Sequence, residues 1–243
     1  ALFFFQKISN VVAYVRGSHQ LHFISINHPF QIRIHPLHFS ESKIFSFYYF
    51  KTTSTLVSAG DGILFTRVII PPYFKDKQPM PETFQFEKIS LYYEGIKFKG
   101  PNNPRFVENV NFGIVLVNVN DTIHIHTSNG TEVQVISNLF ITEHISSLSL
   151  LSYSNLYSNV NSNSLVIGTN NGNVSILKFE LPDPFVPNAP SESCKNIKTY
   201  KITNCPIIMS ELFDRNFLVT VDFDRSVTIF GIQNETVIQQ FRS

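Results

Sequence analysis

The sequence has 243 residues, of which 43% are hydrophobic and 15% are charged, and its formal net charge at pH 7 is +1. A chain of this length buries enough apolar surface for one sizeable domain core or two small ones. The balanced charge lacks the basic field that favours nucleic acid or an anionic membrane, so we expect no nucleic-acid partner.

Two features bear on the compartment. Cys194 and Cys205 are the only cysteines, and a disulfide framework needs more. We therefore expect two free thiols in the cytoplasm, with a single bridge closing a small loop as the alternative. The sequence shows no secretory signal and no apolar window of about 18 residues, so we expect no direct membrane insertion. Asn-x-Ser/Thr triplets occur at Asn120, Asn129, Asn173 and Asn234.

One sequence pattern occurs five times along the chain: a β-rich run, a short turn of Gly, Asp, Asn or Ser, and a second β-rich run. This pattern is typical of a β-hairpin. In chain order the five stretches are 10–26, 56–70, 114–128, 165–179 and 217–232. Their turns centre near Gly17, Asp61, Asp121, Gly172 and Asp224.

Each hairpin is flanked by two further β-rich runs, which gives four antiparallel strands per unit. A repeat of about 40–50 residues with four strands is typical of a propeller blade. We therefore predict an all-β fold, a single β-propeller region over 1–243 with five blades. Their approximate bounds are 1–36, 43–90, 105–137, 144–203 and 205–243.

Three inserts interrupt the repeat, at 71–104, 152–164 and 182–196. They are rich in Pro, Asn and Ser, so we predict loops. Long loops on a rigid scaffold often carry binding residues, although tolerated surface insertions look the same in sequence.

The hairpins resemble those of the WD-repeat family. The similarity lies in "LVIGTNNGNVSILKF" at 165–179 and "LVTVDFDRSVTIFGI" at 218–232. The family's Trp is replaced by Leu177 and Phe230, and its following Asp by Lys178 and Gly231. The resemblance implies a non-catalytic scaffold that binds other proteins or sibling domains of a longer chain. Five blades allow a closed ring or part of a larger one, and the resemblance favours part of a seven-bladed propeller.

A narrower resemblance is to the C-terminal propeller of BEACH-domain, neurobeachin-like proteins. It rests on the "SNG" turn at Ser128–Gly130, on "HISSLSLL" after it, and on the Asn171-Gly172 turn. It implies a role in vesicle trafficking, with a cytoplasmic location and membrane association through a larger protein.

Basic and aromatic residues gather in "FEKISLYYEGIKFKG" at 86–100. Exposed tyrosines beside lysines suit a protein contact. We predict a partner-binding surface made of Lys88, Tyr92, Tyr93, Lys97 and Lys99.

The chain has no P-loop, G-x-S-x-G, G-x-G-x-x-G or H-E-x-x-H motif, so we expect no enzyme activity, no cofactor and no small-molecule substrate. His124 and His126 stand two apart, which places both on one side of a strand. We expect a blade surface there, not a zinc site, because no further ligands stand nearby. Asp222 and Asp224 fall on a hairpin turn, which is the expected role of both.

Two alternatives remain open. One is a five-bladed hydrolase acting on glycans, for which Glu108 and Glu211 are the only acidic residues on the predicted innermost strands. The other is an extracellular adhesion module, which occupied glycans at Asn129 or Asn173 would favour.

Overall fold

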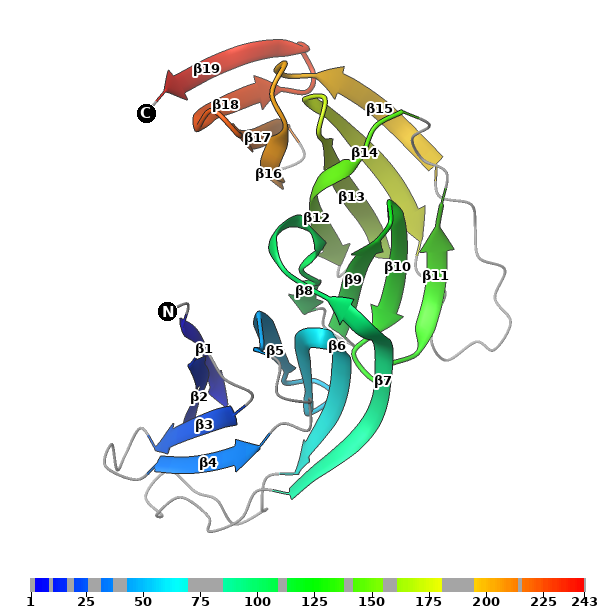
Figure 1. Ribbon diagram of the computed structural model, residues 1–243. Coiled ribbons are helices and arrows are strands. Elements are labelled where there is room, and N and C mark those ends of the chain that lie inside the picture. Colours follow the sequence, from blue (N-terminus) through cyan, green and yellow to red (C-terminus); the bar gives the residue numbers. More distant parts are fainter. Residues whose placement is uncertain are drawn as a thin grey trace. The chain divides into compact units, whose positions relative to one another are not determined.

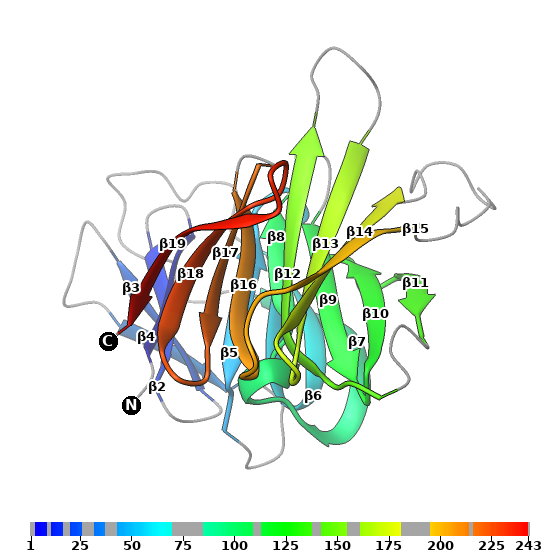
Figure 2. The same ribbon diagram turned by 90° about the horizontal axis from the view of Figure 1, so that it is seen from above.

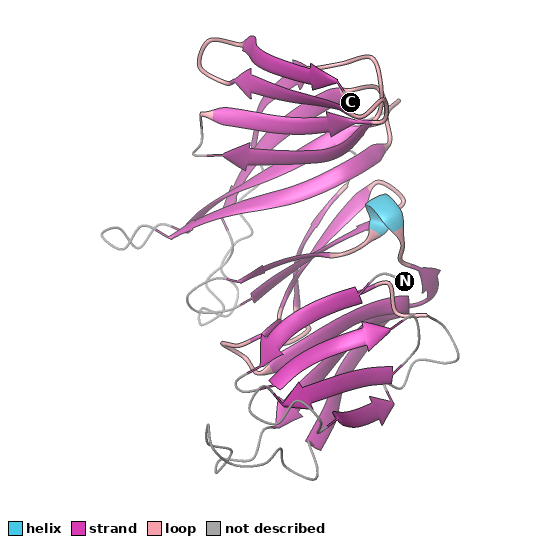
Figure 3. Ribbon diagram, turned by 90° about the vertical axis from the view of Figure 1, so that its left-hand side faces the viewer, coloured by secondary structure: helices cyan, strands magenta, loops and turns pink. Residues whose placement is uncertain are grey.

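A computed structural model describes residues 3–8, 11–16, 20–25, 32–36, 43–69, 85–108, 113–137, 142–154, 161–180, 195–213 and 216–242. These residues form strands and one short 3-10 helix, η1 (Gly100–Asn102), and no α-helix, as the sequence predicted (Figures 1 and 3). None of them builds a helix long and apolar enough to cross a membrane.

The strands form five antiparallel sheets in which neighbours in the chain are neighbours in the sheet. The first sheet holds β1 (Phe3–Ile8), β2 (Val11–Arg16), β3 (Gln20–Ser25) and β4 (Ile32–Pro36), and the second holds β5 (Ser46–Phe50), β6 (Thr55–Ile69) and β7 (Gln85–Lys97). The third sheet holds β8 (Arg105–Glu108), β9 (Gly113–Val119), β10 (Thr122–Thr127) and β11 (Glu132–Ile136). The fourth holds β12 (Ile145–Ser154), β13 (Asn161–Thr169), β14 (Asn173–Glu180) and β15 (Lys195–Lys201). The fifth holds β16 (Ile207–Phe213), β17 (Phe217–Asp222), β18 (Ser226–Gly231) and β19 (Thr236–Arg242).

The second sheet has three strands in this assignment, but β6 doubles back on itself. The Val68 amide donates to the Ser54 carbonyl at 2.8 Å, which a straight strand of this length forbids, because each residue advances the chain by about 3.3 Å. The reversal lies at Asp61 and Gly62, where Gly62 has φ +118°, and Figure 1 shows the bend at one end of β6. The second sheet therefore makes the same four passes of chain as the others, and the hairpin predicted near Asp61 is present.

The other predicted hairpin turns follow the same backbone logic. Asn120 and Asp121 join β9 to β10 with φ of 49° and 62°, as a two-residue hairpin loop with two left-handed residues requires. Gly172 has φ +82° between β13 and β14, and the turn at Asp224 joins β17 to β18. The turn predicted near Gly17 lies outside the described residues.

Two predicted inserts contain more strand than the sequence indicated. Residues 85–97, inside the insert 71–104, form β7 and pair with β6; the second blade was predicted to end at residue 90, so its last strand runs further than expected. Residues 152–154 and 161–164, inside the insert 152–164, extend β12 and β13, which Figure 2 shows running on together. The Ser and Asn residues there are strand because each pairs with the neighbouring strand. Residues 71–84 and most of 182–196 lie outside the described part of the chain.

The chain divides into two compact units, residues 1–115 with 126–131 and residues 116–125 with 132–243. The first unit has an aromatic core in which Phe50, Phe65 and Phe98 are fully buried. Phe106 of β8 stacks on Tyr48 at 5.5 Å between ring centroids. The core of the second unit contains Val166, Val174 and Ile176 of the fourth sheet, packed against Ile207, Leu218 and Phe230 of the fifth.

In the second unit, each segment that leads into a sheet is held by the turn between the second and third strands of the preceding sheet. The Asp121 carboxylate accepts from the Ile145 amide at 2.8 Å and lies 2.6 Å from Nδ1 of His144. The Gly172 carbonyl accepts from the amides of Ile202 and Thr203 at 3.0 and 3.3 Å. Consecutive sheets are therefore fastened at the same edge.

The same lead-in segments are also held by the turn of the sheet that they enter. The His144 amide donates to Oδ1 of Asn170 at 2.9 Å, and the Thr203 hydroxyl donates to Asp222 at 3.1 Å. Asp222 is 4% exposed and also accepts from the Ser226 amide. Its role in the turn, predicted from sequence, is confirmed.

The fourth and fifth sheets are repeats of one another down to the pairing of single residues. Val166 pairs with Ile176, and Val174 with Tyr200. At the matching positions of the fifth sheet, Val219 pairs with Ile229, and Val227 with Phe241. Both sheets interrupt their first and third pairings with a bulge at the same place. By this alignment Gly168 of β13 corresponds to Val221 of β17.

A first prediction concerns the packing between these sheets. A Cβ on Gly168 would lie 2.6 and 2.8 Å from side-chain carbons of Ile207 and would also meet the Ser147 hydroxyl. We expect Gly168→Ala to destabilise the second unit by about 1–3 kcal/mol, because overpacking forces the neighbours to move. Urea unfolding of the purified protein measures this loss. The control is Val221→Ala at the corresponding, half-exposed position, which should cost less than half as much; equal costs would contradict the prediction.

A second prediction concerns Cys205 in the segment before β16. Its thiol donates to Oδ2 of Asp224 at 3.0 Å, and this hydrogen bond, followed by burial and the charge of Asp224, raises the pKa of the Cys205 thiol. Because only the thiolate reacts, maleimide labelling at pH 7–8 should be slower than for an ordinary thiol. In a Cys194→Ser background we expect Asp224→Asn to lower that pKa and to speed labelling several-fold. An unchanged rate across that pH range would show that Asp224 does not control the thiol.

Candidate partner-binding site

The predicted partner-binding residues lie on β7 and in the segment that follows it, all within the first unit. Lys88, Lys97 and Lys99 are exposed, whereas Tyr92 and Tyr93 are half-buried. Phe98, between two of the lysines, is fully buried. It anchors an otherwise exposed run from Glu94 to Gly100.

A bulge in β7 shapes this run. Tyr92 pairs with Ile63 and Lys97 pairs with Asp61, so residues 93–96 stand opposite Gly62 alone. Tyr93 has φ +55° and Gly95 has φ +83°. A left-handed tyrosine costs on the order of 1–3 kcal/mol and persists only where its surroundings hold it. Bulges of this kind re-aim side chains.

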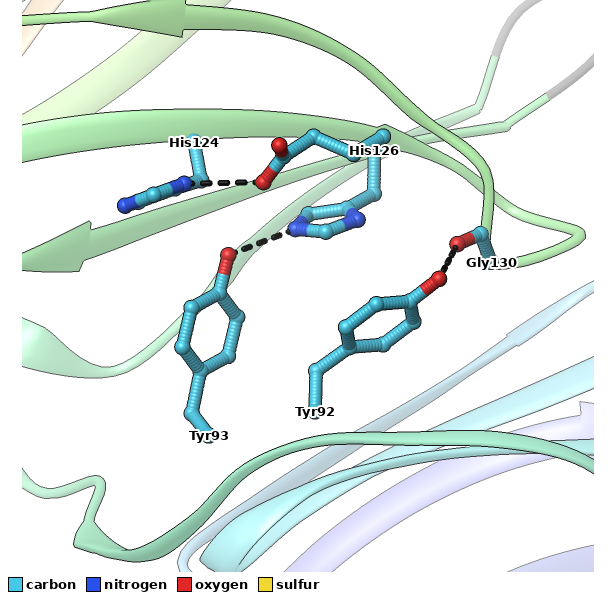
Figure 4. A network of polar contacts seen from close by, with 6 residues as sticks. Tyr92, Tyr93, His124, His126 and Gly130 are labelled. Carbon is cyan, nitrogen blue, oxygen red and sulfur yellow. Dashed lines mark hydrogen bonds and ion pairs between the residues drawn. The ribbon is translucent and has the colours of Figure 1, made fainter.

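The tyrosine hydroxyls are what hold it. The Tyr92 hydroxyl donates to the Gly130 carbonyl at 2.6 Å, and the Tyr93 hydroxyl lies 2.8 Å from Nε2 of His126 (Figure 4). The rings of Tyr92 and His126 have centroids 4.9 Å apart, and the rings of Tyr93 and Phe98 have centroids 5.9 Å apart. Both tyrosine hydroxyls are therefore hydrogen-bonded within the protein and are not available to a partner.

His126 corrects a sequence prediction. We expected His124 and His126 to lie on a blade surface, but His126 is 0% exposed. It is covered within the first unit by the tyrosines of β7 and by Phe65, whose ring centroid is 5.9 Å away. A strand pattern gives the side on which two residues lie and does not show what packs there.

His124, in the second unit, is half-buried and lies 2.8 Å from the Glu132 carboxylate. The described part of the chain contains no group of three or more His, Cys, Asp or Glu side chains able to hold a metal ion.

The charges around the bulge are predominantly basic. Glu87 forms an ion pair with Arg67 at 3.0 Å, on two largely exposed side chains. Apart from this pair, residues 88–99 contain three exposed lysines and one exposed acidic residue, Glu94. Ile96, which the sequence analysis missed, is 38% exposed at the same bulge. The glycines at 95 and 100, both with positive φ, were the available signal that this run turns outward.

The two carboxylates of the hydrolase alternative belong to different units, and both are exposed. Glu108 accepts from the Tyr48 hydroxyl at 3.2 Å and from the Lys51 amide at 3.0 Å. Burial, and after it the charge of Glu108 and its hydrogen bond, raises the pKa of Tyr48. Glu108 therefore acts as an acceptor within its own unit.

Comparison with known proteins identifies the fold. No family model matches the sequence, and no curated protein is similar enough to show a relationship. Among solved structures, the chain is similar to a chain in the crystal structure of a mitotic checkpoint complex, with a TM-score of 0.55 and 12% sequence identity. The match covers 96% of this chain and 60% of that chain. This similarity supports a β-propeller fold, and the antiparallel sheets are consistent with its blades.

A third prediction tests what holds the bulge. Tyr93→Phe removes the hydroxyl from Nε2 of His126 in a fully buried ring, so we expect a loss of about 1–3 kcal/mol in stability. In a chain of this size, each kcal/mol lowers Tm by about 2–4 °C, which calorimetry resolves. Lys97→Ala, two residues past the bulge centre and exposed, should change stability by no more than about 0.5 kcal/mol. A Tm unchanged by Tyr93→Phe would show that another contact fixes Tyr93.

Proposed function

We propose that this chain is a non-catalytic scaffold that binds another protein through the exposed run at the end of β7. The observation that carries the proposal is the anchored bulge: Phe98 and the two tyrosines fix it from inside, while Ile96 and the lysines face solvent. A rigid exposed loop with an apolar residue among charges binds at a low entropy cost. The solved chain that it resembles belongs to a mitotic checkpoint complex, and membership of an assembly is in keeping with a binding role.

The proposed contact residues are those predicted from the sequence, with the roles divided. Lys88, Lys97 and Lys99 meet the partner, whereas Tyr92 and Tyr93 position the bulge. Because the exposed charge is mainly basic, we expect the partner to offer carboxylates. Charges at the rim of an interface mostly raise the association rate, so binding should weaken with salt.

The finer assignments remain proposals from the sequence. They are a seven-bladed ring with blades outside residues 1–243, the propeller of a BEACH-type trafficking protein, and a cytoplasmic location with membrane association through the larger protein. The parent reading frame discriminates among them. A BEACH domain upstream would support the trafficking assignment, and further repeats alone would support only the larger ring.

A fourth prediction tests the surface by charge reversal. Proteins crosslinked to residues 1–243 in cells are purified and their affinity for the wild-type chain is measured. We expect Lys88→Glu, Lys97→Glu and Lys99→Glu together to weaken binding by about tenfold or more, roughly 1.4 kcal/mol, and to flatten its salt dependence. The matched control reverses Lys43, Lys178 and Arg242, which are exposed elsewhere.

Equal weakening by both triple variants would indicate an effect of net charge alone. Full affinity in the β7 variant would contradict the assignment of this surface. The same purified protein is assayed for glycan hydrolysis, and activity lost on Glu108→Gln or Glu211→Gln would overturn the non-catalytic proposal in favour of the hydrolase.

A further inference from the structure

One side of the fifth sheet carries apolar residues that nothing among the described residues of its unit covers. Met209, Phe213, Phe217 and Phe241 are 41%, 67%, 37% and 48% exposed. Val219, Val221, Val227 and Ile229 are partly exposed beside them.

Alternation along the strands places these residues on a single side. Leu218 and Phe230 are buried against the fourth sheet, and Ser210 is hydrogen-bonded to Ser147 there at 2.8 Å. Their neighbours in sequence point to the opposite side of the sheet. The cross-strand pairs on that side are Met209–Val221, Val219–Ile229, Val227–Phe241 and Phe213–Phe217.

The fourth sheet shows what this side of the repeat does when it is covered. Its matching residues are Val166, Val174, Ile176 and Tyr200, which are 0%, 0%, 5% and 7% exposed because the fifth sheet packs on them. The corresponding residues of the fifth sheet are Val219, Val227, Ile229 and Phe241. Three of the four side chains are identical and Phe241 takes the place of Tyr200, with the same pairing and the same bulges. This set is buried in the fourth sheet and partly or largely exposed in the fifth.

We infer that the open side of β16–β19 binds a further four-stranded antiparallel sheet of the same repeat, supplied by a part of the same polypeptide outside residues 1–243. The inference extends an interface already present between the fourth and fifth sheets. Those sheets are consecutive in the chain and are joined by residues 202–206 alone, which favours a consecutive repeat over a second molecule. It rests on the larger ring proposed above, for which it names the contact surface, and it does not depend on the proposed role of β7.

The residues that differ between the two sheets specify the occupant. Gly168 leaves room for Ile207, whereas Val221 fills the corresponding place. The incoming sheet must therefore carry a small residue where the fifth sheet has Ile207. The hydroxyls of Ser147 and Ser149 meet Ser210, but Met209 and Glu211 occupy the matching positions. The incoming first strand should thus be apolar beside Met209 and basic beside Glu211.

The turn of the fifth sheet adds a second contact. Arg225, with φ +61°, takes the place that Gly172 has in the fourth sheet, where the carbonyl receives two amides of the next lead-in segment. Phe223, in the same turn, is 70% exposed. The backbone carbonyl of Arg225 is therefore positioned for the lead-in segment of the incoming sheet.

The test compares cysteine accessibility in residues 1–243 alone with accessibility in the polypeptide made from the natural gene. Met209→Cys is introduced in a background without Cys194 and Cys205. We expect maleimide to label it rapidly in residues 1–243 and at least about tenfold more slowly in the natural polypeptide. The slower rate is expected because the corresponding residue of the covered fourth sheet, Ser147, is 1% exposed. Gln240→Cys, exposed and on the other side of the sheet, should be labelled rapidly in both and reports that the chain is folded.

Three results would overturn the inference. The first is rapid labelling of Met209→Cys in both polypeptides. The second is slow labelling in residues 1–243 with a dimer in light scattering, which would assign the surface to a second copy. The third is slow labelling in a monomer of residues 1–243, which would assign it to the chain's own strands. If Met209→Cys fails to fold, Phe241→Cys, which matches buried Tyr200, gives the same readout.

Discussion

The structure of the second unit depends on one repeated interaction, in which the turn between the second and third strands of a sheet holds the backbone that enters the next sheet. Asp121 and Gly172 do this from the preceding sheet, and Asn170 and Asp222 do it from the sheet being entered. A four-stranded sheet has two sides to bury, and apolar packing alone does not fix an angle or a register. Hydrogen bonds to a short connection at one edge do fix them, because they join specific atoms.

These contacts explain how the repeat persists without the tryptophan that its family resemblance implies. Leu177 and Phe230, at the corresponding positions, are 2% and 6% exposed, so they still fill the core. Consecutive sheets are instead joined by hydrogen bonds that the turn carboxylates, the Asn170 side-chain amide and the Gly172 carbonyl accept from the lead-in segments. Such acceptors tolerate changes in core volume, since their geometry is set by the left-handed residues of the turns, among them Asn120, Asp121 and Gly172.

The parts of the fold that sequence could predict are those fixed by local chemistry. The turns at Asp121 and Gly172 were found because left-handed backbone restricts which residues can stand there. The left-handed residue of the third turn is Arg225, and that turn was found from its aspartates and from the β-rich runs on both sides. The extension of β12 and β13 through Ser and Asn was missed, because pairing with a neighbouring strand decides it. The exposure of the three lysines was foreseeable from their charge, but the burial of His126 was not, since it depends on β7 meeting β10 across 33 residues of sequence.

At the β7 bulge the tyrosines are held inside the protein while the lysines and Ile96 are exposed, and this limits the kind of complex that the proposed surface would form. Exposed tyrosines would have supplied the buried aromatic contacts that dominate tight interfaces, but Tyr92 and Tyr93 are held by Gly130 and His126. The bulge therefore presents one aliphatic side chain, Ile96, among lysines. Solvent-exposed charges contribute little to affinity and much to the association rate. For the binding role proposed above, a surface of this composition, held in place from inside, favours a rapid and reversible contact with an acidic partner over a permanent interface.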